Sequence, residues 1–272
     1  MYVLERFLAR LAVSRYTESF VLKGGMLLAA MDARRPTLDA DLLADHLAND
    51  EASVVARVVE IASLPVDVDD GVEYLTDTTA GRTIREDSLY AGIRVTMATR
   101  VSSAEVKLQL DINFGNPVTP APTRIDYPTL RPDTPAIRLL GYPLATVLAE
   151  KLVTAVDLGA ANSRVRDFAD IWTRIGRHRV DAAELRAALE ATAGHRGLPL
   201  RPLSGAVAAL AATREGTYTA FRRRLDKDGS ALPLHLAAVL HDVVAFADPV
   251  LSDPPLVRHR WDPVDGRWHA LG

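Results

Sequence analysis

The chain contains no cysteine, no long apolar run and no large excess of charge of either sign. The absence of cysteine among 272 residues excludes disulfides and thiolate metal sites, and fits a reducing cytosol. No apolar run approaches the roughly 20 residues that a membrane helix needs, and residues 1–14 predict an amphipathic helix instead of a signal peptide. The net charge of −3 gives no global basic field, although it does not exclude a local basic patch. We therefore expect a soluble, cytoplasmic protein with no membrane partner.

Two common catalytic signatures are absent as well. The seven histidines show no H-x-x-x-H spacing, and no serine lies in a nucleophile elbow, so the sequence does not support hydrolase chemistry. Hydrophobic residues make up 48% of the chain and charged residues 25%, which is ordinary for a globular protein. The length allows one large domain or two smaller ones.

Helical and strand-like segments alternate in the first half of the chain, and the second half is helical. In the first half we expect helices at 2–13, 25–32 and 50–63, strands at 37–43, 82–88, 91–100 and 104–113, and a strand or helix start at 20–22. Six prolines predict an irregular connector over 116–135. Beyond it we expect helices at 143–158, 164–177, 181–193, 203–212, 215–226 and 232–247. The pattern predicts an α+β head and a helical tail, with the boundary near residue 140.

Two aspartates one residue apart, Asp39 and Asp41, are the most informative feature of the sequence. Side chains alternate between the faces of a strand, so Thr37, Asp39 and Asp41 would project together from one side. Parallel carboxylates repel each other unless a cation lies between them, and hard oxygen ligands suit Mg²⁺, or Mn²⁺ in its place. The other interpretation of D-x-D is a solvated strand edge or a turn.

A glycine pair and a third aspartate favour the metal interpretation. Gly24 and Gly25, which follow Lys23, offer bare backbone N–H groups at the start of a helix, where a phosphate can dock. Asp111 lies on the polar face of the strictly alternating strand 104–113, so three carboxylates converge if the two strands are neighbours. Asp111 would then complete the metal site or accept a proton from the attacking hydroxyl. A glycine loop followed by D-x-D is how nucleotidyltransferases hold a nucleoside triphosphate and its metal.

Three charged residues of the second half are further candidates. Lys151 emerges from the edge of an apolar stripe, where its ammonium either binds a triphosphate or reaches out into water. Asp167 and Asp170 lie on one helix face, where they could form ordinary ion pairs, and the residues alone assign neither to catalysis. Two basic runs are either solvated helix faces or places where RNA phosphates bind: Arg164, Arg166, Arg174, Arg177, His178 and Arg179, and Arg222, Arg223, Arg224 and Lys227.

Taken in order, these motifs resemble the AbiEii/AbiGii (MenT-like) nucleotidyltransferase toxin family. The resemblance spans nearly the whole chain and rests on residues 4–11, 20–28, 35–41, 90–95, 110–115, 149–152 and 162–172. It implies a polymerase-β-like nucleotidyltransferase head with a mixed sheet in residues 1–140, followed by a helical C-terminal domain in residues 141–272. That helical domain is expected to contribute Lys151 and Asp170 to the site.

The resemblance also implies an activity. It predicts the toxin of a toxin–antitoxin or phage-defence pair, an Mg²⁺-dependent enzyme that transfers NMP from NTP to the 3′ end of tRNA and blocks translation. Its partners would be NTP, tRNA and an antitoxin from a separate gene. The expected catalytic residues are Asp39, Asp41, Lys151 and Asp170; the substrate-binding residues are Lys23, Gly24, Gly25, Thr37, Arg166 and Asp167; and the metal ligands are Asp39, Asp41 and Asp111. The alternatives are a nucleotidyltransferase acting on a protein hydroxyl or a small molecule, and a nucleotide-binding regulator without turnover.

Overall fold

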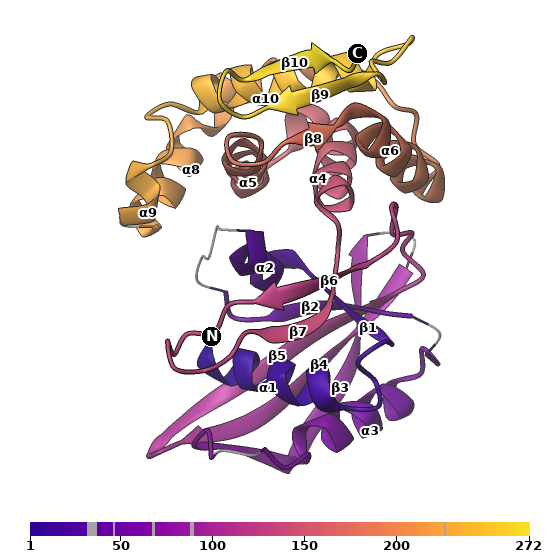
Figure 1. Cartoon of the computed structure of the whole chain (residues 1–272). Helices are drawn as coiled ribbons and strands as arrows, with labels where there is room; N and C mark the ends of the chain where they lie inside the picture. Colours follow the sequence, from indigo (N-terminus) through magenta and orange to yellow (C-terminus); the bar gives the residue numbers. More distant parts are fainter. Residues whose placement is uncertain (32–36, 46, 67–68, 88–89, 226) are drawn as a thin grey trace. The chain divides into compact units, whose positions relative to one another are not determined.

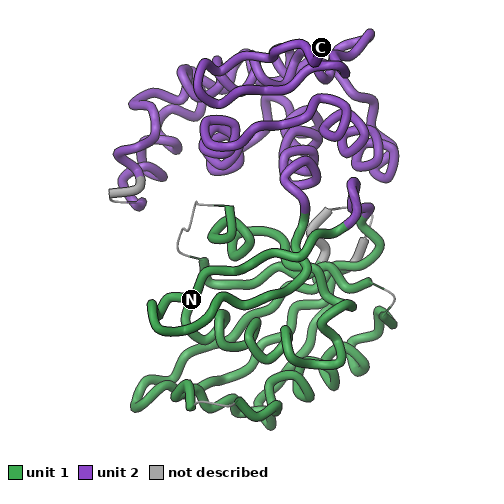
Figure 2. Tube along the Cα trace, in the orientation of Figure 1, with its two compact units in different colours: residues 1–116, 122–142 green, residues 117–121, 143–272 purple. Residues whose placement is uncertain are grey.

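The computed structural model of the chain describes residues 1–31, 37–45, 47–66, 69–87, 90–225 and 227–272. These residues form two compact units, coloured separately in Figure 2. Unit 1 comprises Met1–Asn116 and Pro122–Tyr142, and unit 2 comprises Pro117–Ala121 and Pro143–Gly272. None of the described helices is long and apolar enough to cross a membrane.

Unit 1 is built on a mixed seven-stranded sheet in the order β3-β4-β5-β2-β1-β7-β6 (Figure 1). Its strands are β1 (Phe20–Lys23), β2 (Ala40–Ala44), β3 (Val72–Asp87), β4 (Tyr90–Val101), β5 (Ala104–Phe114), β6 (Thr123–Tyr127) and β7 (Ile137–Gly141). Its described helices are α1 (Tyr2–Val13), α2 (Gly24–Leu27), the 3-10 helix η1 (Leu28–Met31) and α3 (Glu51–Ala62). The β2–β5 and β1–β7 pairs are parallel, and the other neighbouring pairs are antiparallel.

Helices α1 and α3 cover the apolar face of this sheet (Figure 1). Leu42 of β2 and Leu110 of β5 are almost completely buried there. Gly81 of β3 lies so close to α3 that a Cβ would come within 2.6 Å of the Glu51 side chain, and it pairs with the buried Val95 of β4. Because strand side chains alternate, the residues between these apolar ones face the other side of the sheet. That side carries the charged residues of the site.

Local sequence rules account for several of these elements. The apolar stripe of α1 is buried as its period predicts, and the backbone N–H of Ser53 donates to the Asp50 carboxylate over 2.8 Å, which caps α3. The strict alternation of residues 104–113 forms β5, and residues 20–22 belong to a strand. The helix expected at 25–32 is the short α2 followed by η1. The expected ends at Asp32 and Ser88 lie outside the described residues.

Three predictions for unit 1 were wrong. The strand expected from residue 37 begins at Ala40, because the Thr37 hydroxyl bonds locally to Asp39 instead of leaving the segment extended. The strand expected from residue 82 begins ten residues earlier, at Val72. A bulge between Leu75 and Ala80 interrupts the alternation of its first half, so the pattern there does not indicate a strand. The proline-rich connector contains β6, an edge strand that its prolines flank without entering.

Unit 2 consists mainly of helices packed around one core. They are α4 (Leu144–Leu158), the 3-10 helix η2 (Gly159–Ala161), α5 (Val165–Ile175), α6 (Ala182–Arg196), α7 (Leu203–Val207), α8 (Leu210–Arg224), α9 (Lys227–Ser230) and α10 (Leu236–Leu251). The helices expected at 143–158, 164–177 and 181–193 correspond to α4, α5 and α6. The helix expected at 203–212 is instead divided between α7 and α8, and the helix expected at 232–247 begins and ends four residues later, as α10. The helix expected at 215–226 falls in α8, which begins earlier, and its expected end at residue 226 lies outside the described residues.

A small sheet that the sequence did not predict closes one side of this core. It consists of β8 (Val180–Asp181), β9 (His259–Asp262) and β10 (Arg267–Ala270), in the order β10-β9-β8. Trp261 and Trp268 pack on Phe246 of α10, with ring centroids 5.0 and 5.2 Å away. The Trp261 indole N–H donates to the Ile175 carbonyl over 2.7 Å. The strands thus anchor the C-terminal segment on the helices. Together, the mixed sheet of unit 1 and the helices of unit 2 confirm the predicted α+β class.

Candidate functional site

The glycine turn after β1 lies directly against the Asp41 carboxylate. Gly24 has φ +63°, and a Cβ built on it would lie 1.8 Å from Oδ2 of Asp41. Only glycine combines this left-handed conformation with so close an approach. The helix that follows, α2, is only four residues long. The structural feature of the turn is therefore its contact with Asp41, and not the N-terminus of a long helix.

Asp39 directly precedes β2 and is positioned by Thr37. The Thr37 hydroxyl donates to Oδ1 of Asp39 over 2.8 Å and also lies 3.2 Å from its carbonyl oxygen. Asp39 is half-buried, and no donor among the described residues reaches its second carboxylate oxygen. That oxygen is therefore available to a ligand. Leu38 beside it is 89% exposed and holds neither carboxylate.

The predicted neighbours Asp41 and Asp111 do lie on adjacent strands. They are register partners in the parallel pair of β2 and β5, whose backbones are about 4.8 Å apart in such pairs. On the outer side of β2, Lys23 of β1 is the register partner of Asp41, and on the outer side of β5, Arg94 of β4 is the register partner of Asp111. One row across four strands therefore reads Lys23, Asp41, Asp111, Arg94. We call it the charged row.

Both ends of the charged row are cations in defined surroundings. Lys23 is 9% exposed, and its ammonium lies 5.5 Å from the centroid of the Tyr142 ring. At the other end, the Arg94 guanidinium donates from Nε to Oδ1 of Asp111 over 2.6 Å and from Nη2 to Oδ2 over 2.5 Å. Asp111 is 2% exposed, so this bidentate pair is nearly shielded from solvent on the carboxylate side.

A divalent cation fits Asp39 and Asp41 better than it fits all three aspartates. Asp39 has an available oxygen and both residues are half-buried, whereas both oxygens of Asp111 accept from Arg94. Among the residues that the structure describes, no group of three or more acidic or histidine side chains is arranged to hold a metal ion. Two carboxylates are enough for Mg²⁺, because it usually keeps several waters and takes its remaining ligands from substrate phosphates.

A second cluster of charge, within unit 2, joins α4 to α5. The Lys151 ammonium donates to Oδ1 of Asp167 over 2.6 Å and to Oδ2 of Asp170 over 3.0 Å. The three side chains are 18%, 15% and 8% exposed. Burial disfavours the charged ammonium, but the charges of Asp170 and Asp167 outweigh it and raise the pKa of Lys151 above its ordinary value. Lys151 is therefore a paired cation, not a side chain that extends freely into water.

The first basic run is only partly a surface patch. Arg164, Arg166, Arg177 and Arg179 are exposed. Arg174 is 1% exposed and donates to the Asp170 carbonyl over 2.6 Å, so it supports α5 from within the core. Arg164 and Arg166, at the start of α5, are thus exposed residues that a polyanion could reach.

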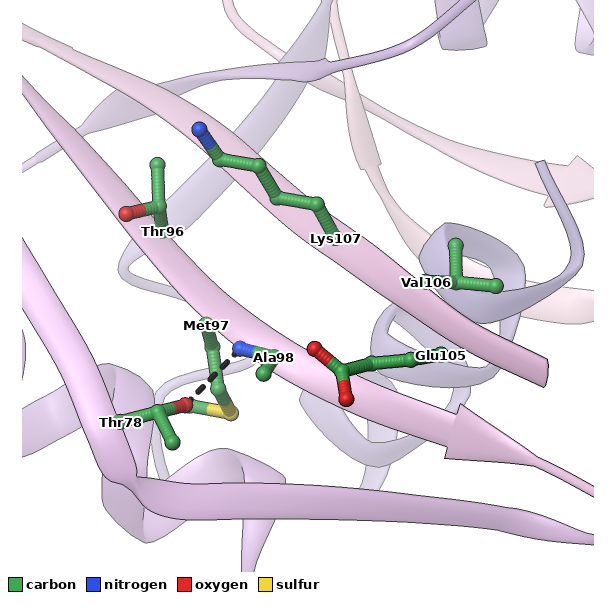
Figure 3. Close-up of a pocket in the computed structure, with 7 residues that line it drawn as sticks. All are labelled: Thr78, Thr96, Met97, Ala98, Glu105, Val106 and Lys107. Atoms are coloured by element: carbon green, nitrogen blue, oxygen red, sulfur yellow. Dashed lines mark hydrogen bonds between the residues drawn. The ribbon is translucent and has the colours of Figure 1, made fainter. Parts of the chain in front are cut away.

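A hollow of about 380 Å³ lies elsewhere on unit 1, along β3, β4 and β5 (Figure 3). Its lining residues include Thr78, Met97 and Lys107, and the Ala98 N–H donates to the Thr78 hydroxyl over 2.9 Å. None of the residues expected to act in catalysis, substrate binding or metal binding lines it. Thr78 belongs to the bulge of β3 between Leu75 and Ala80, which faces this part of β4.

Arg94 is the residue that sequence reasoning missed. It belongs to the motif at residues 90–95, and the alternation of strand 91–100 could have placed it on the same face as the carboxylates. Its partner depends on the register of the β4–β5 hairpin, which the sequence reasoning did not work out and which places residue 94 opposite residue 111.

Carboxylates beside a glycine turn on a mixed sheet are the arrangement expected of a nucleotidyltransferase. The chain belongs to the AbiEii nucleotidyl transferase toxin family of type IV toxin–antitoxin systems, whose family model matches residues 6–256. Two solved structures from Helicobacter pylori also resemble it. JHP933 is 13% identical over 93% of this chain and 91% of its own, with a TM-score of 0.48. A second protein, assigned as a nucleotidyltransferase, is 14% identical over 93% of this chain and 95% of its own, with a TM-score of 0.47. Among curated proteins, none matches this chain significantly.

Proposed function

We propose that this toxin is an NTP-dependent nucleotidyltransferase that adds a nucleoside monophosphate to the 3′ end of tRNA, using Mg²⁺ held by Asp39 and Asp41. Family membership supplies the transferase class, the NTP and the antitoxin partner. The observation that carries the assignment to these residues is the approach of the Gly24 turn to Asp41, beside an Asp39 that Thr37 orients. Both features suit a metal-bound triphosphate.

The reaction joins the 3′ oxygen of the acceptor to the α-phosphorus of the NTP. The bond from the α-phosphorus to the bridging oxygen breaks, pyrophosphate leaves with the electron pair, and the hydroxyl proton passes to water. When bound, Mg²⁺ neutralises phosphate charge and polarises the α-phosphate. Asp39 and Asp41 hold that charge in place, and the backbone at Gly24 and Gly25 leaves space for the phosphates.

We include Lys151 and Asp170 among the residues that the transfer requires. Triphosphate carries several negative charges, and a lysine that stays protonated offsets them as they redistribute. The raised pKa of Lys151 keeps it charged at every physiological pH. Asp170 and Asp167 hold its ammonium in one position, which makes them positioning residues for this cation.

An RNA acceptor is favoured by the exposed arginines next to this cluster. Arg164 and Arg166 stand at the start of α5, with their side chains in solvent. Guanidinium groups of this kind bind backbone phosphates without reading sequence. Transfer to the 3′ end of tRNA would block aminoacylation and halt translation, as expected of a toxin in an antitoxin-controlled or phage-defence pair.

The test is incubation of the purified protein with total tRNA, Mg²⁺ and each α-³²P-labelled NTP in turn, followed by a denaturing gel. We expect label in tRNA with one nucleotide, its loss in Asp39→Asn, and its retention in Asp77→Asn, an exposed aspartate of β3. Label in a protein band would assign a protein hydroxyl as the acceptor. No label from a folded protein that binds NTP would refute transfer to tRNA and favour a small-molecule acceptor or a nucleotide-binding regulator.

A further inference from the structure

The Asp111–Arg94 pair is a bidentate ion pair within the charged row. Two short, parallel hydrogen bonds join the guanidinium to the two oxygens of one carboxylate. Asp111 is 2% exposed, while the Arg94 side chain is 26% exposed. The arginine therefore holds a buried carboxylate from the more accessible side.

The order of the strands places Asp111 between Asp41 and Arg94. β5 lies between β2 and β4, so Asp41 and Arg94 approach Asp111 from opposite sides. A divalent cation shared by Asp41 and Asp111 would have to bind the remaining lone pair of an oxygen that already accepts from Arg94. It would also lie near the positive guanidinium, which repels it in a site of low dielectric.

The charges of the row lead to the same conclusion. The carboxylates of Asp41 and Asp111 lie on neighbouring strands and repel each other. If Asp111 were a metal ligand, the metal ion would have to neutralise both of them. Here each carboxylate has a cation as its outer neighbour in the row: Lys23 beside Asp41, and Arg94 beside Asp111. Asp39 lies outside this balance and adds the negative charge that a metal ion would meet.

We propose that Arg94 is a positioning residue that occupies Asp111 and confines the divalent cation to Asp39 and Asp41. The inference rests on the proposed function, which assigns the metal ion to Asp39 and Asp41. It replaces the ligand or proton-acceptor role expected for Asp111 with a structural role. Loss of Arg94 would then free Asp111 and create a cation site that the natural protein lacks.

The test measures binding of Mn²⁺ without nucleotide, followed by the electron paramagnetic resonance signal of the free ion. Arg94→Met should bind one additional Mn²⁺, or bind it at least about tenfold more tightly, than the natural chain. The double variant Arg94→Met/Asp111→Asn should return to the natural binding curve. Arg100→Met is the matched control, because Arg100 lies on the same strand and makes an exposed pair with Glu73.

A folded Arg94→Met that binds Mn²⁺ with the natural stoichiometry and affinity would overturn the proposal. Since that variant leaves a buried carboxylate unpaired, Asp111→Asn alone provides a second test that keeps the arginine. The proposal expects this variant to bind Mn²⁺ as the natural chain does, and a loss of tenfold or more would show that Asp111 is a ligand.

Failure of the proposed function gives a different pattern. If Asp39→Asn and Asp41→Asn bind Mn²⁺ as the natural chain does, these residues are not the metal site, and the proposed function loses its ligands. The comparison of Arg94→Met with the double variant would still report on Arg94, since it depends only on what binds at Asp111.

Discussion

Replacing Gly24 with alanine should separate the folding role of the glycine turn from its role beside Asp41. The left-handed backbone at φ +63° costs a residue with a Cβ about 1–2 kcal/mol. The new Cβ would also lie 1.8 Å from Oδ2 of Asp41, so the carboxylate must retreat by roughly 1.7 Å or more to reach ordinary contact. Misplacing a reacting group by about 1 Å can cost about 100-fold in rate, and we expect a loss of that size in nucleotide transfer.

Gly71→Ala supplies the matched control. Gly71 has φ +68° in the same unit, and a Cβ there would meet nothing within 4 Å. Both variants should lose about 1–2 kcal/mol of unfolding free energy from the backbone term. Only Gly24→Ala should also lose Mn²⁺ affinity and transfer. The three tryptophans, Trp172, Trp261 and Trp268, all lie in unit 2, so urea unfolding of unit 1 should be followed by far-UV circular dichroism.

Equal behaviour of the two variants would refute this reasoning. If Gly24→Ala transfers nucleotide and binds Mn²⁺ as Gly71→Ala does, the position of Asp41 beside the turn does not matter to the reaction. The glycine would then serve only the backbone conformation.

Two further variants test the charged groups. Lys151→Met leaves the Asp167 and Asp170 carboxylates without their shared cation and should cost unit 2 about 3 kcal/mol in urea unfolding, whereas a loss below about 1 kcal/mol would show an exposed, screened pair. Because the pKa of Lys151 is raised on folding, its stabilisation is complete below the ordinary lysine pKa of about 10.4 and should fade as pH rises through the raised value, a trend that Lys151→Met must lack. Thr37→Val removes the hydrogen bond to Asp39 and should lower Mn²⁺ affinity about 2- to 10-fold, while Thr37→Ser should restore it; no change in either would remove Thr37 from the site.

Elements with a strong local period could be predicted from the sequence. The stripe of α1, the Asp50 cap of α3 and the alternation of β5 each depend on residues close together in the chain. The same is true of the faces: alternation alone places Asp111 on the polar side of its strand. These features need no knowledge of strand order.

Features that depend on distant partners could not be predicted. β6 and β7 pair across a loop rich in proline, and β9 pairs with β8 over almost eighty residues of helix. The pairing of Asp111 with Arg94 is less distant, because β4 and β5 are consecutive strands, yet it depends on their register and on the second neighbour of β5. Sequence places both side chains on polar faces, but only the order β4-β5-β2 determines which neighbour binds the carboxylate.

The charge balance of each unit predicts that folding does not require the metal. In unit 1 the charged row pairs two carboxylates with two cations, and Asp39 alone adds a negative charge at the half-exposed edge. In unit 2 the Lys151 cluster supplies its own cation. Removing divalent ions with EDTA should therefore leave the melting temperature within a few degrees of its value in Mg²⁺.

The size of that shift follows from ligand linkage. Mg²⁺ at about ten times its dissociation constant stabilises the folded state by only about 1.4 kcal/mol, which for a chain of this length moves the melting temperature by about 2–4 °C per kcal/mol. A structural metal site behaves differently, because chelation removes of the order of 10 kcal/mol and unfolds the protein. Calorimetry with EDTA and with Mg²⁺ distinguishes the two. Unfolding on chelation would show that the folded state requires a metal ion to neutralise the carboxylates near β2. The positive charges of Arg94 and Lys23 would then be insufficient to offset their repulsion.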